Sequence, residues 1–112
     1  MTTFDLASKF YSKKLIIGSN GLKFIDYLDE GNPKDIIYIL FDNITSIANI
    51  TNYCYDRNFG FKIKAKQMGN VNVMYQDFDI KILDEFKANL AYKLISDGFN
   101  ESCKKKDERI GI

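Results

Sequence analysis

The stretch LIIGSNGLKFID, residues 15–26, predicts a β-hairpin near the beginning of the chain. Two apolar runs flank the sequence GSNG at 18–21, and its Asn-Gly pair is a strong short-range hairpin signal because both residues tolerate a positive φ. In the returning run, Leu22 and Phe24 fall on one face of a strand, and the residues between and after them fall on the other. We therefore expect the chain to begin with antiparallel β-structure.

Further segments with strand character follow the hairpin. Residues 36–41, IIYILF, are apolar on both faces, which predicts either a central strand covered on both sides or a strand covered by a partner. The segment 29–35 contains the only proline and is predicted to be a loop. Residues 44–55 are rich in β-branched and aromatic residues but alternate imperfectly, which indicates a bulge or bend. Alternation predicts a strand over 59–65 and a return strand over 71–75.

The hydrophobic period lengthens from two to between three and four after residue 79. The recurring apolar residues predict one stripe on an amphipathic helix: Leu83, Phe86, Leu90 and Leu94, with Ile82 and Ile95 beside them. We expect Asp79 to be the N-cap of this helix and Gly98 to end it. The remaining segment, 99–112, is charged and unpatterned, and we expect it to be a flexible tail.

This order of elements predicts an α+β, mainly β fold. A strongly bent antiparallel sheet or partly open barrel would be capped by one C-terminal amphipathic helix, which is the pleckstrin-homology-like architecture. The length of 112 residues suits one compact domain, which we place at residues 1–98. The helix, centred on Phe86 and Leu90, is expected to close the open end of the sheet.

Histidine is absent, which removes the commonest general base and the commonest metal ligand. Cys54 and Cys103 are far apart in the sequence and form no CxxC pair, so we expect no metal site and no cofactor. No segment resembles a signal peptide or approaches the roughly 20 apolar residues of a membrane-spanning helix. We therefore expect a cytoplasmic protein whose two cysteines are free thiols.

The sequence contains no recognisable catalytic pattern. No serine or cysteine has a histidine to activate it. The carboxylate pairs Asp77/Asp79 and Asp84/Glu85 are interpreted as a strand end and the first turn of a helix, where carboxylates are favourable. We therefore expect no enzymatic activity and no catalytic residues, although a deep pocket lined by Tyr75, Asp77 and Asp79 would favour a small enzyme.

Two groups of lysines are candidate binding residues. The first group lies near the first hairpin and the second on one face of the strand that follows residue 59: Lys13, Lys14 and Lys23, and Lys62, Lys64 and Lys66. If the groups meet, they form an anionic-lipid or phosphate site in which each cation contributes about 1 kcal/mol. The alternative is that alternating lysines keep a half-exposed strand hydrated and prevent aggregation. The net charge of +1 argues against nucleic-acid binding.

The order of features over residues 14–47 resembles bacterial pleckstrin-homology-like and GRAM-like domains. More narrowly, the chain is similar to a small uncharacterised family encoded beside mannose-type phosphotransferase operons. The matching residues in this first segment are Lys14, Ile16, Ile17, Gly18, Gly21, Phe24, Ile37, Ile39, Phe41 and Ile44. Within 59–79, FGFKIKAKQMGNVNVMYQDFD, the resemblance depends on Phe61, Ile63, Lys66, Gly69 and Asp77.

The resemblance implies a non-enzymatic binding or regulatory module, an accessory regulator of mannose-family sugar uptake, with no catalytic residues to transfer. A lipid- or membrane-surface-binding domain that uses the two lysine groups is the alternative. A protein partner is expected in the first case. Self-association is a further possibility, because the segment 36–41 offers more apolar surface than one small helix can cover.

Overall fold

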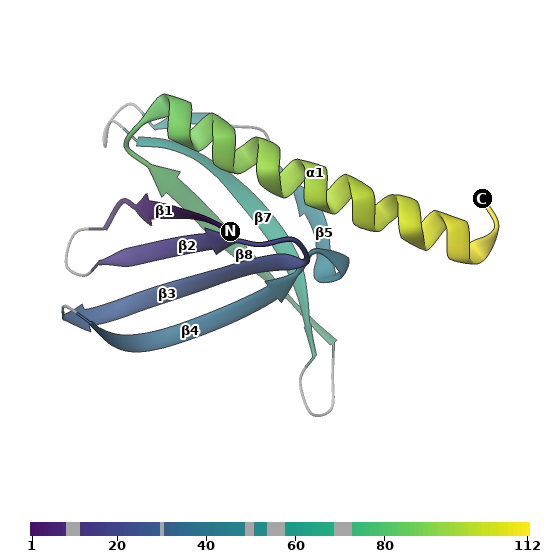
Figure 1. The fold of residues 1–112 in the computed structure, drawn as a ribbon, viewed down its shortest axis with the longest axis horizontal. Helices are drawn as coiled ribbons and strands as arrows, with labels where there is room; N and C mark the ends of the chain where they lie inside the picture. The colour runs from purple at the N-terminus through teal and green to yellow at the C-terminus, as the bar shows by residue number, and fades with distance from the viewer. Residues whose placement is uncertain (9–11, 30, 49–50, 54–57, 69–72) are drawn as a thin grey trace.

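The computed structural model has two antiparallel β-sheets and one long C-terminal helix (Figure 1). It describes residues 1–8, 12–29, 31–48, 51–53, 58–68 and 73–112. The first sheet consists of four strands that neighbour one another in chain order: β1 (Thr2–Leu6), β2 (Lys13–Ile17), β3 (Gly21–Asp29) and β4 (Asn32–Leu40). We refer to it as sheet A. The predicted class, mainly β with one C-terminal helix, is confirmed.

The second sheet, sheet B, is arranged around its longest strand. A single turn of 3-10 helix, η1 (Phe41–Asn43), leads out of sheet A into sheet B. The strands of sheet B are β5 (Ile44–Ile47), β6 (Thr51–Tyr53), β7 (Asn58–Met68) and β8 (Val73–Ile82). β7 pairs with β5 and β6 along one edge and with β8 along the other, always antiparallel. The helix α1 (Glu85–Ile110) follows.

The core lies between the inner faces of the two sheets and is closed by α1. Its buried members in sheet A are Phe4, Leu15, Ile17, Leu22 and Ile39, and those in sheet B are Ile44, Phe61, Ile63, Ala65, Phe78, Ile80 and Ile82. The two sheets approach each other where β1 lies beside β8. There the Ala7 N–H donates a hydrogen bond of 2.8 Å to the Lys81 carbonyl oxygen. At the opposite edge of sheet A, β4 pairs only with β3 among the strands that the structure describes. The sheet is therefore bent but not closed into a barrel.

The hairpin between β2 and β3 is confirmed, but its second glycine has a different role from the one predicted. The Gly18 N–H donates to the Gly21 carbonyl oxygen over 2.9 Å. Gly21 itself does not have a positive φ. A Cβ added at Gly21 would overlap the Ile39 carbonyl oxygen and lie 2.9 Å from the Leu40 Cα atom. Glycine is needed there because the β4 backbone approaches so closely.

The strand predicted over 36–41 is an edge strand, so its predicted central position is wrong. β4 begins at Asn32, inside the segment predicted to be a loop, directly after Gly31 with φ of +88°. Its inner-face residue Ile39 is buried, whereas Ile36, Tyr38 and Leu40 are 43, 70 and 55% exposed. The other interpretation of this apolar segment, coverage by a partner, stays a prediction.

The start of α1 lies later than predicted, because β8 continues through residue 82. Phe78, Ile80 and Ile82 are buried in alternation, which is the period of a strand. The observed N-cap is Asp84, whose carboxylate accepts a hydrogen bond of 3.0 Å from the Lys87 N–H. The prediction of Asp79 as the N-cap is therefore wrong.

The face of α1 that packs on the sheets matches the predicted stripe only in part: Ile95 is buried and Leu94 packs against the core as predicted, whereas the first part of the stripe is exposed. The buried residues are small or aliphatic: Ala88, Ala91, Ile95 and Ser102. Phe86 and Leu83, expected to face the core, are 77 and 66% exposed. The alanines allow the helix backbone to approach the sheets closely, and Tyr92 fills the side of the contact with its ring edge-to-face on Phe61 at 5.2 Å.

Gly98 lies inside the helix, so the predicted helix end there is wrong. The helix continues to Ile110, and Gly111, with φ of +80°, ends it. Residues 99–110, expected to be part of a flexible tail, are helical and extend beyond the sheets (Figure 1). A Cβ at Gly98 would overlap the ring of Phe41, which is buried.

Replacing Gly98 with alanine tests this contact. Alanine favours a helix by about 1 kcal/mol over glycine, yet we expect Gly98→Ala to destabilise the protein by about 1–3 kcal/mol because the new methyl group overpacks Phe41. The matched control is Asn100→Ala at an exposed position of the same helix, which is expected to be neutral or slightly stabilising. Urea denaturation measures both, and a more stable Gly98→Ala protein would contradict the prediction.

Candidate functional site

The lysines of the first group do not share one face of sheet A, because successive side chains of a strand point to opposite faces. Lys14 and Lys23 project from the outer face of sheet A, where Lys14 lies 3.8 Å from an Asp5 carboxylate oxygen. The Lys23 ammonium lies over the ring of Tyr38, 5.3 Å from its centroid. Lys13 lies at the start of β2, and its ammonium is 3.8 Å from Asp26. Two of the three cations therefore have a carboxylate beside them.

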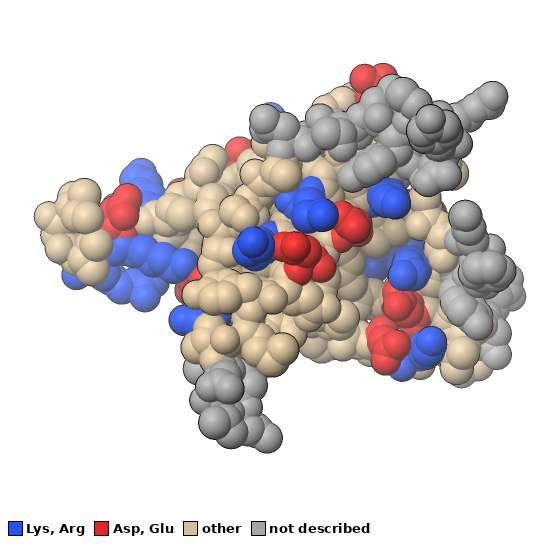
Figure 2. Space-filling model, turned by 180° about the vertical axis from the view of Figure 1, so that it is seen from behind, with Lys and Arg blue, Asp and Glu red and all other residues tan. Residues whose placement is uncertain are grey.

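The second lysine group lies on the outer face of sheet B. Lys62 and Lys64 are exposed on β7 between the buried residues of the inner face. They are in register with Asp79 and Asp77 of β8, and the Lys62 ammonium is 3.8 Å from Asp79. Lys66 is in register with Tyr75. Seen from behind, lysine and carboxylate side chains are interspersed over the part of the surface that the sheets form (Figure 2).

The two lysine groups do not form one site. Lys14 and Lys23 belong to the outer face of sheet A, whereas the β7 lysines belong to the outer face of sheet B. The inner faces of these sheets enclose the common core, so the two outer faces point in different directions.

The carboxylates considered for catalysis are also dispersed. Asp77 and Asp79 are exposed on β8 opposite the lysines, and Asp84 caps α1. Within the described parts of the chain, no three Asp, Glu or Cys side chains gather as metal ligands. Cys103 is a free thiol, while Cys54 lies outside the described residues.

A polar cluster joins η1 to the second half of α1. The Ser102 hydroxyl donates to a carboxylate oxygen of Asp42, and the Lys106 ammonium donates to the Asp42 carbonyl oxygen over 2.5 Å. The hydrogen bond from Ser102 is the main cause that lowers the pKa of Asp42. Desolvation of the carboxylate raises this pKa. The positive charges of Lys106, Arg109 and Lys105 lower it further. A groove of about 360 Å³ lies beside this cluster. Because Asp42 and Glu101 line it together with Lys105 and Arg109, its charge is mixed.

Exposed apolar side chains lie on the outer face of sheet A along β4. Ile36, Tyr38 and Leu40 project outward from the edge strand and are all exposed. We call these three residues the β4 surface. Next to them is an open groove of about 390 Å³, lined by the side chains of Met1 and Ile16 and by Gly21 where β3 meets β4. The groove is apolar apart from Asn20 and Lys23 at its margin.

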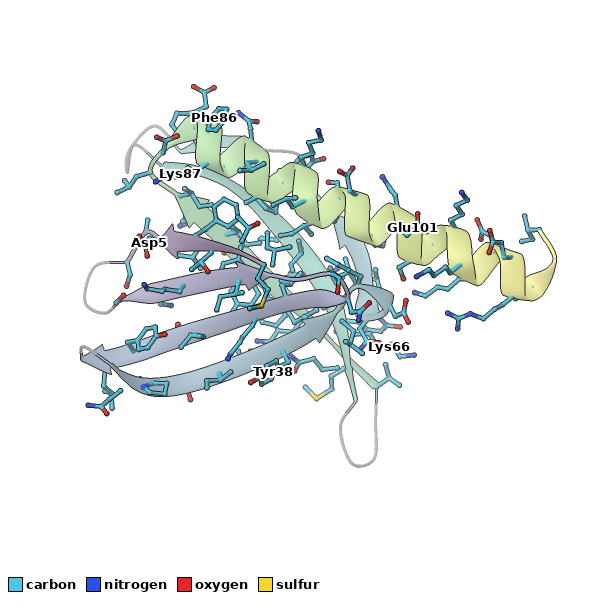
Figure 3. All side chains as sticks on the ribbon, viewed as in Figure 1. Asp5, Tyr38, Lys66, Phe86, Lys87 and Glu101 are labelled. Atoms are coloured by element: carbon cyan, nitrogen blue, oxygen red, sulfur yellow. The ribbon has the colours of Figure 1, made fainter. Side chains whose placement is uncertain are left out.

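A second exposed apolar group lies on the first turns of α1 and the residue that follows β8. Leu83, Phe86 and Leu90, the residues predicted to close the sheet, are 66, 77 and 36% exposed. Figure 3 shows Phe86 and Tyr38 on opposite sides of the molecule, so this helix group is separate from the β4 surface.

The sequence revealed some of these features and not others. The double-sided apolar character of 36–41 indicated the β4 surface, although it did not reveal that the strand lies at an edge. The contact of Asp42 with Ser102 joins residues 60 positions apart, and no local signal in the sequence predicts it.

Comparison with known proteins gave no match: no protein-family model, no curated protein and no solved structure is significantly similar to this chain. Among the described residues, no helix combines the length and apolar character needed to cross a bilayer.

The Asp42–Ser102 contact makes stability depend on pH. Because the folded pKa of Asp42 is depressed, its contribution to stability is fully present above the ordinary value of 3.8 and is lost as the pH falls toward the lower folded pKa. We expect Ser102→Ala to raise the Asp42 pKa in an NMR titration of its carboxyl carbon and to weaken this loss of stability on acidification. Ser96→Ala, at a half-buried helix position, is the control. An unchanged Asp42 pKa in Ser102→Ala would contradict the assignment.

Proposed function

We propose that the protein is a non-enzymatic protein-binding module that accepts an extended polypeptide segment along β4. The observation that carries the proposal is the combination of an edge strand of nine residues with outward apolar side chains on the same strand. An edge strand presents backbone N–H and C=O groups that a further strand can pair with, and this pairing is a recurrent mode of peptide recognition.

The features that usually protect a sheet edge are missing from the second half of β4. Natural edge strands carry charges, prolines or bulges that discourage pairing. In β4, Pro33, Lys34 and Asp35 lie in the first half, and the register irregularities with β3 occur there as well. From Ile36 to Leu40 the strand is regular, uncharged and apolar. This half is therefore the part suited to receive a polypeptide.

The side chains and the groove define the chemistry of the expected partner. A strand added to β4 would place alternate side chains on the outer face, beside Ile36, Tyr38 and Leu40. Apolar side chains at these positions would remove the β4 surface from water, at about 25 cal/mol per Å² of apolar area. The partner segment is thus extended, uncharged over about five residues and apolar at alternate positions.

The family resemblance suggests the process in which such a module takes part. The protein would act in the cytoplasm as an accessory regulator of mannose-family sugar uptake. The lipid-binding alternative has weaker support, because Lys13, Lys14 and Lys62 each have a carboxylate oxygen at 3.8 Å. A surface that neutralises its own cations attracts an anionic membrane less strongly.

A library of displayed peptides about ten residues long tests the proposal. Selection on the purified protein is expected to enrich uncharged sequences with apolar residues at alternate positions, as β-strand addition requires. For one enriched synthetic peptide, we expect Tyr38→Lys to weaken the dissociation constant about tenfold or more, because a charge then replaces an apolar contact on the edge strand.

The matched control is Phe86→Lys, which introduces the same charge at an exposed aromatic residue on the opposite side of the molecule (Figure 3). This variant is expected to bind the peptide with unchanged affinity. Equal binding by Tyr38→Lys, or no enrichment on the monomeric protein, contradicts the proposed function. Salt-sensitive co-sedimentation with vesicles of anionic phospholipid, in the absence of peptide binding, would favour the lipid alternative.

A further inference from the structure

We infer that the segment received by β4 is β4 of a second copy of this chain, paired antiparallel around a two-fold axis at Tyr38. The inference rests on the proposed function, because it names the partner of the same edge strand. Closed two-fold dimers are the commonest protein oligomers, and their interface must be complementary to itself. The β4 sequence meets this requirement in one register.

Geometry restricts the registers that two copies of β4 can adopt. In an antiparallel sheet, residues directly opposite each other project from the same face. Pairing around a two-fold axis must therefore place one residue of β4 opposite itself. An axis at Ile37 brings the charged residues Lys34 and Asp35 opposite Leu40 and Ile39 of the second copy. An axis at Ile39 leaves only three residues to pair, because β4 ends at Leu40.

An axis at Tyr38 avoids both difficulties. Tyr38 then lies opposite Tyr38 of the second copy, and Ile36 lies opposite its Leu40. On the inner face, Ile37 lies opposite Ile39 of the second copy. All five residues that pair are uncharged, so no charge is buried without a partner and no like charges face each other.

The apolar rows of sheet A continue across this junction. On the outer face, Ile25 of β3 is in register with Ile36 of β4, and Leu40 of the second copy would be the next residue across the sheet. On the inner face, Phe24 is in register with Ile37. The next residues across the sheet would be Ile39 and Leu22 of the second copy. Two four-stranded sheets would thus become one sheet of eight strands, with the exposed apolar residues of β4 in its centre.

The charged residues near the junction do not oppose a second copy. The paired segment ends at Leu40, where each chain turns into η1, so Lys34 and Asp35 lie outside the five paired residues. Lys23, on the neighbouring strand, is separated from its symmetry mate by the two tyrosines. A second copy therefore meets β4 along an uncharged segment that is complementary to itself.

A cysteine placed on the axis tests the register. In a Cys54→Ser/Cys103→Ser background, Tyr38→Cys is expected to form a disulfide-linked dimer on mild oxidation. Residues directly opposite in an antiparallel pair have Cα atoms about 4.5–5.5 Å apart, which a disulfide can span. Ile36→Cys alone and Leu40→Cys alone should remain mostly unlinked, whereas an equimolar mixture of the two should cross-link.

Light scattering after size exclusion measures association without a cross-link. We expect the parent protein to have twice the mass of one chain, 13.0 kDa, at micromolar concentration. Tyr38→Lys should raise the dimer dissociation constant about a hundredfold or more, because two like charges would meet on the axis and the apolar contact is lost. Phe86→Lys should remain dimeric. Circular dichroism and urea denaturation confirm that both variants are folded.

The outcomes separate this inference from the proposed function. A monomer that binds the selected peptides through Tyr38 overturns the dimer and leaves the protein-binding proposal standing. A monomer that binds no peptide overturns both. A dimer that persists in Tyr38→Lys, or cross-links with Ile37→Cys but not with Tyr38→Cys, overturns the register and the surface proposed here.

Discussion

The contact between the Phe41 ring and the backbone of α1 at Gly98 is the constraint on which the arrangement of this protein depends. Phe41 belongs to η1, where the chain leaves sheet A and enters sheet B. The absence of a side chain at Gly98 allows the helix to rest directly on the aromatic ring. The point at which the sheets are joined is therefore also the point at which the helix is held, and the Asp42–Ser102 and Asp42–Lys106 hydrogen bonds strengthen it.

Once α1 is held in this way, its rotation about its own axis is determined. Ala88, Ala91 and Ile95 lie one to two turns apart on the same face as Gly98, and this face is directed to the sheets. Larger side chains would keep the helix away from Phe41. Phe86 and Leu90 consequently project from another face, although they are the more hydrophobic residues. Backbone proximity, rather than the largest apolar area, thus selected the buried face.

The same turn at η1 leaves β4 with one neighbour. The chain crosses to sheet B immediately after Leu40, so in the described structure no later strand returns to pair with the open edge of sheet A. The two sheets approach each other at β1 and β8 instead. The lysines and carboxylates on the outer faces are interspersed and partly paired, which favours hydration over the capture of an anion. On β4, by contrast, exposed apolar side chains lie on a strand with one open edge.

The sequence by itself determined the class of this protein: antiparallel strands first and one helix last, because alternation and turn residues are local properties. It also marked 36–41 as apolar on both faces. Only the tertiary structure decided that this strand lies at an edge, that β8 extends to Ile82, and that the helix buries alanines and passes through Gly98. Hydrophobic periodicity reports which side chains are apolar, whereas burial depends on how closely two backbones approach. That distance is set by contacts such as Phe41 with Gly98, between residues far apart in the chain.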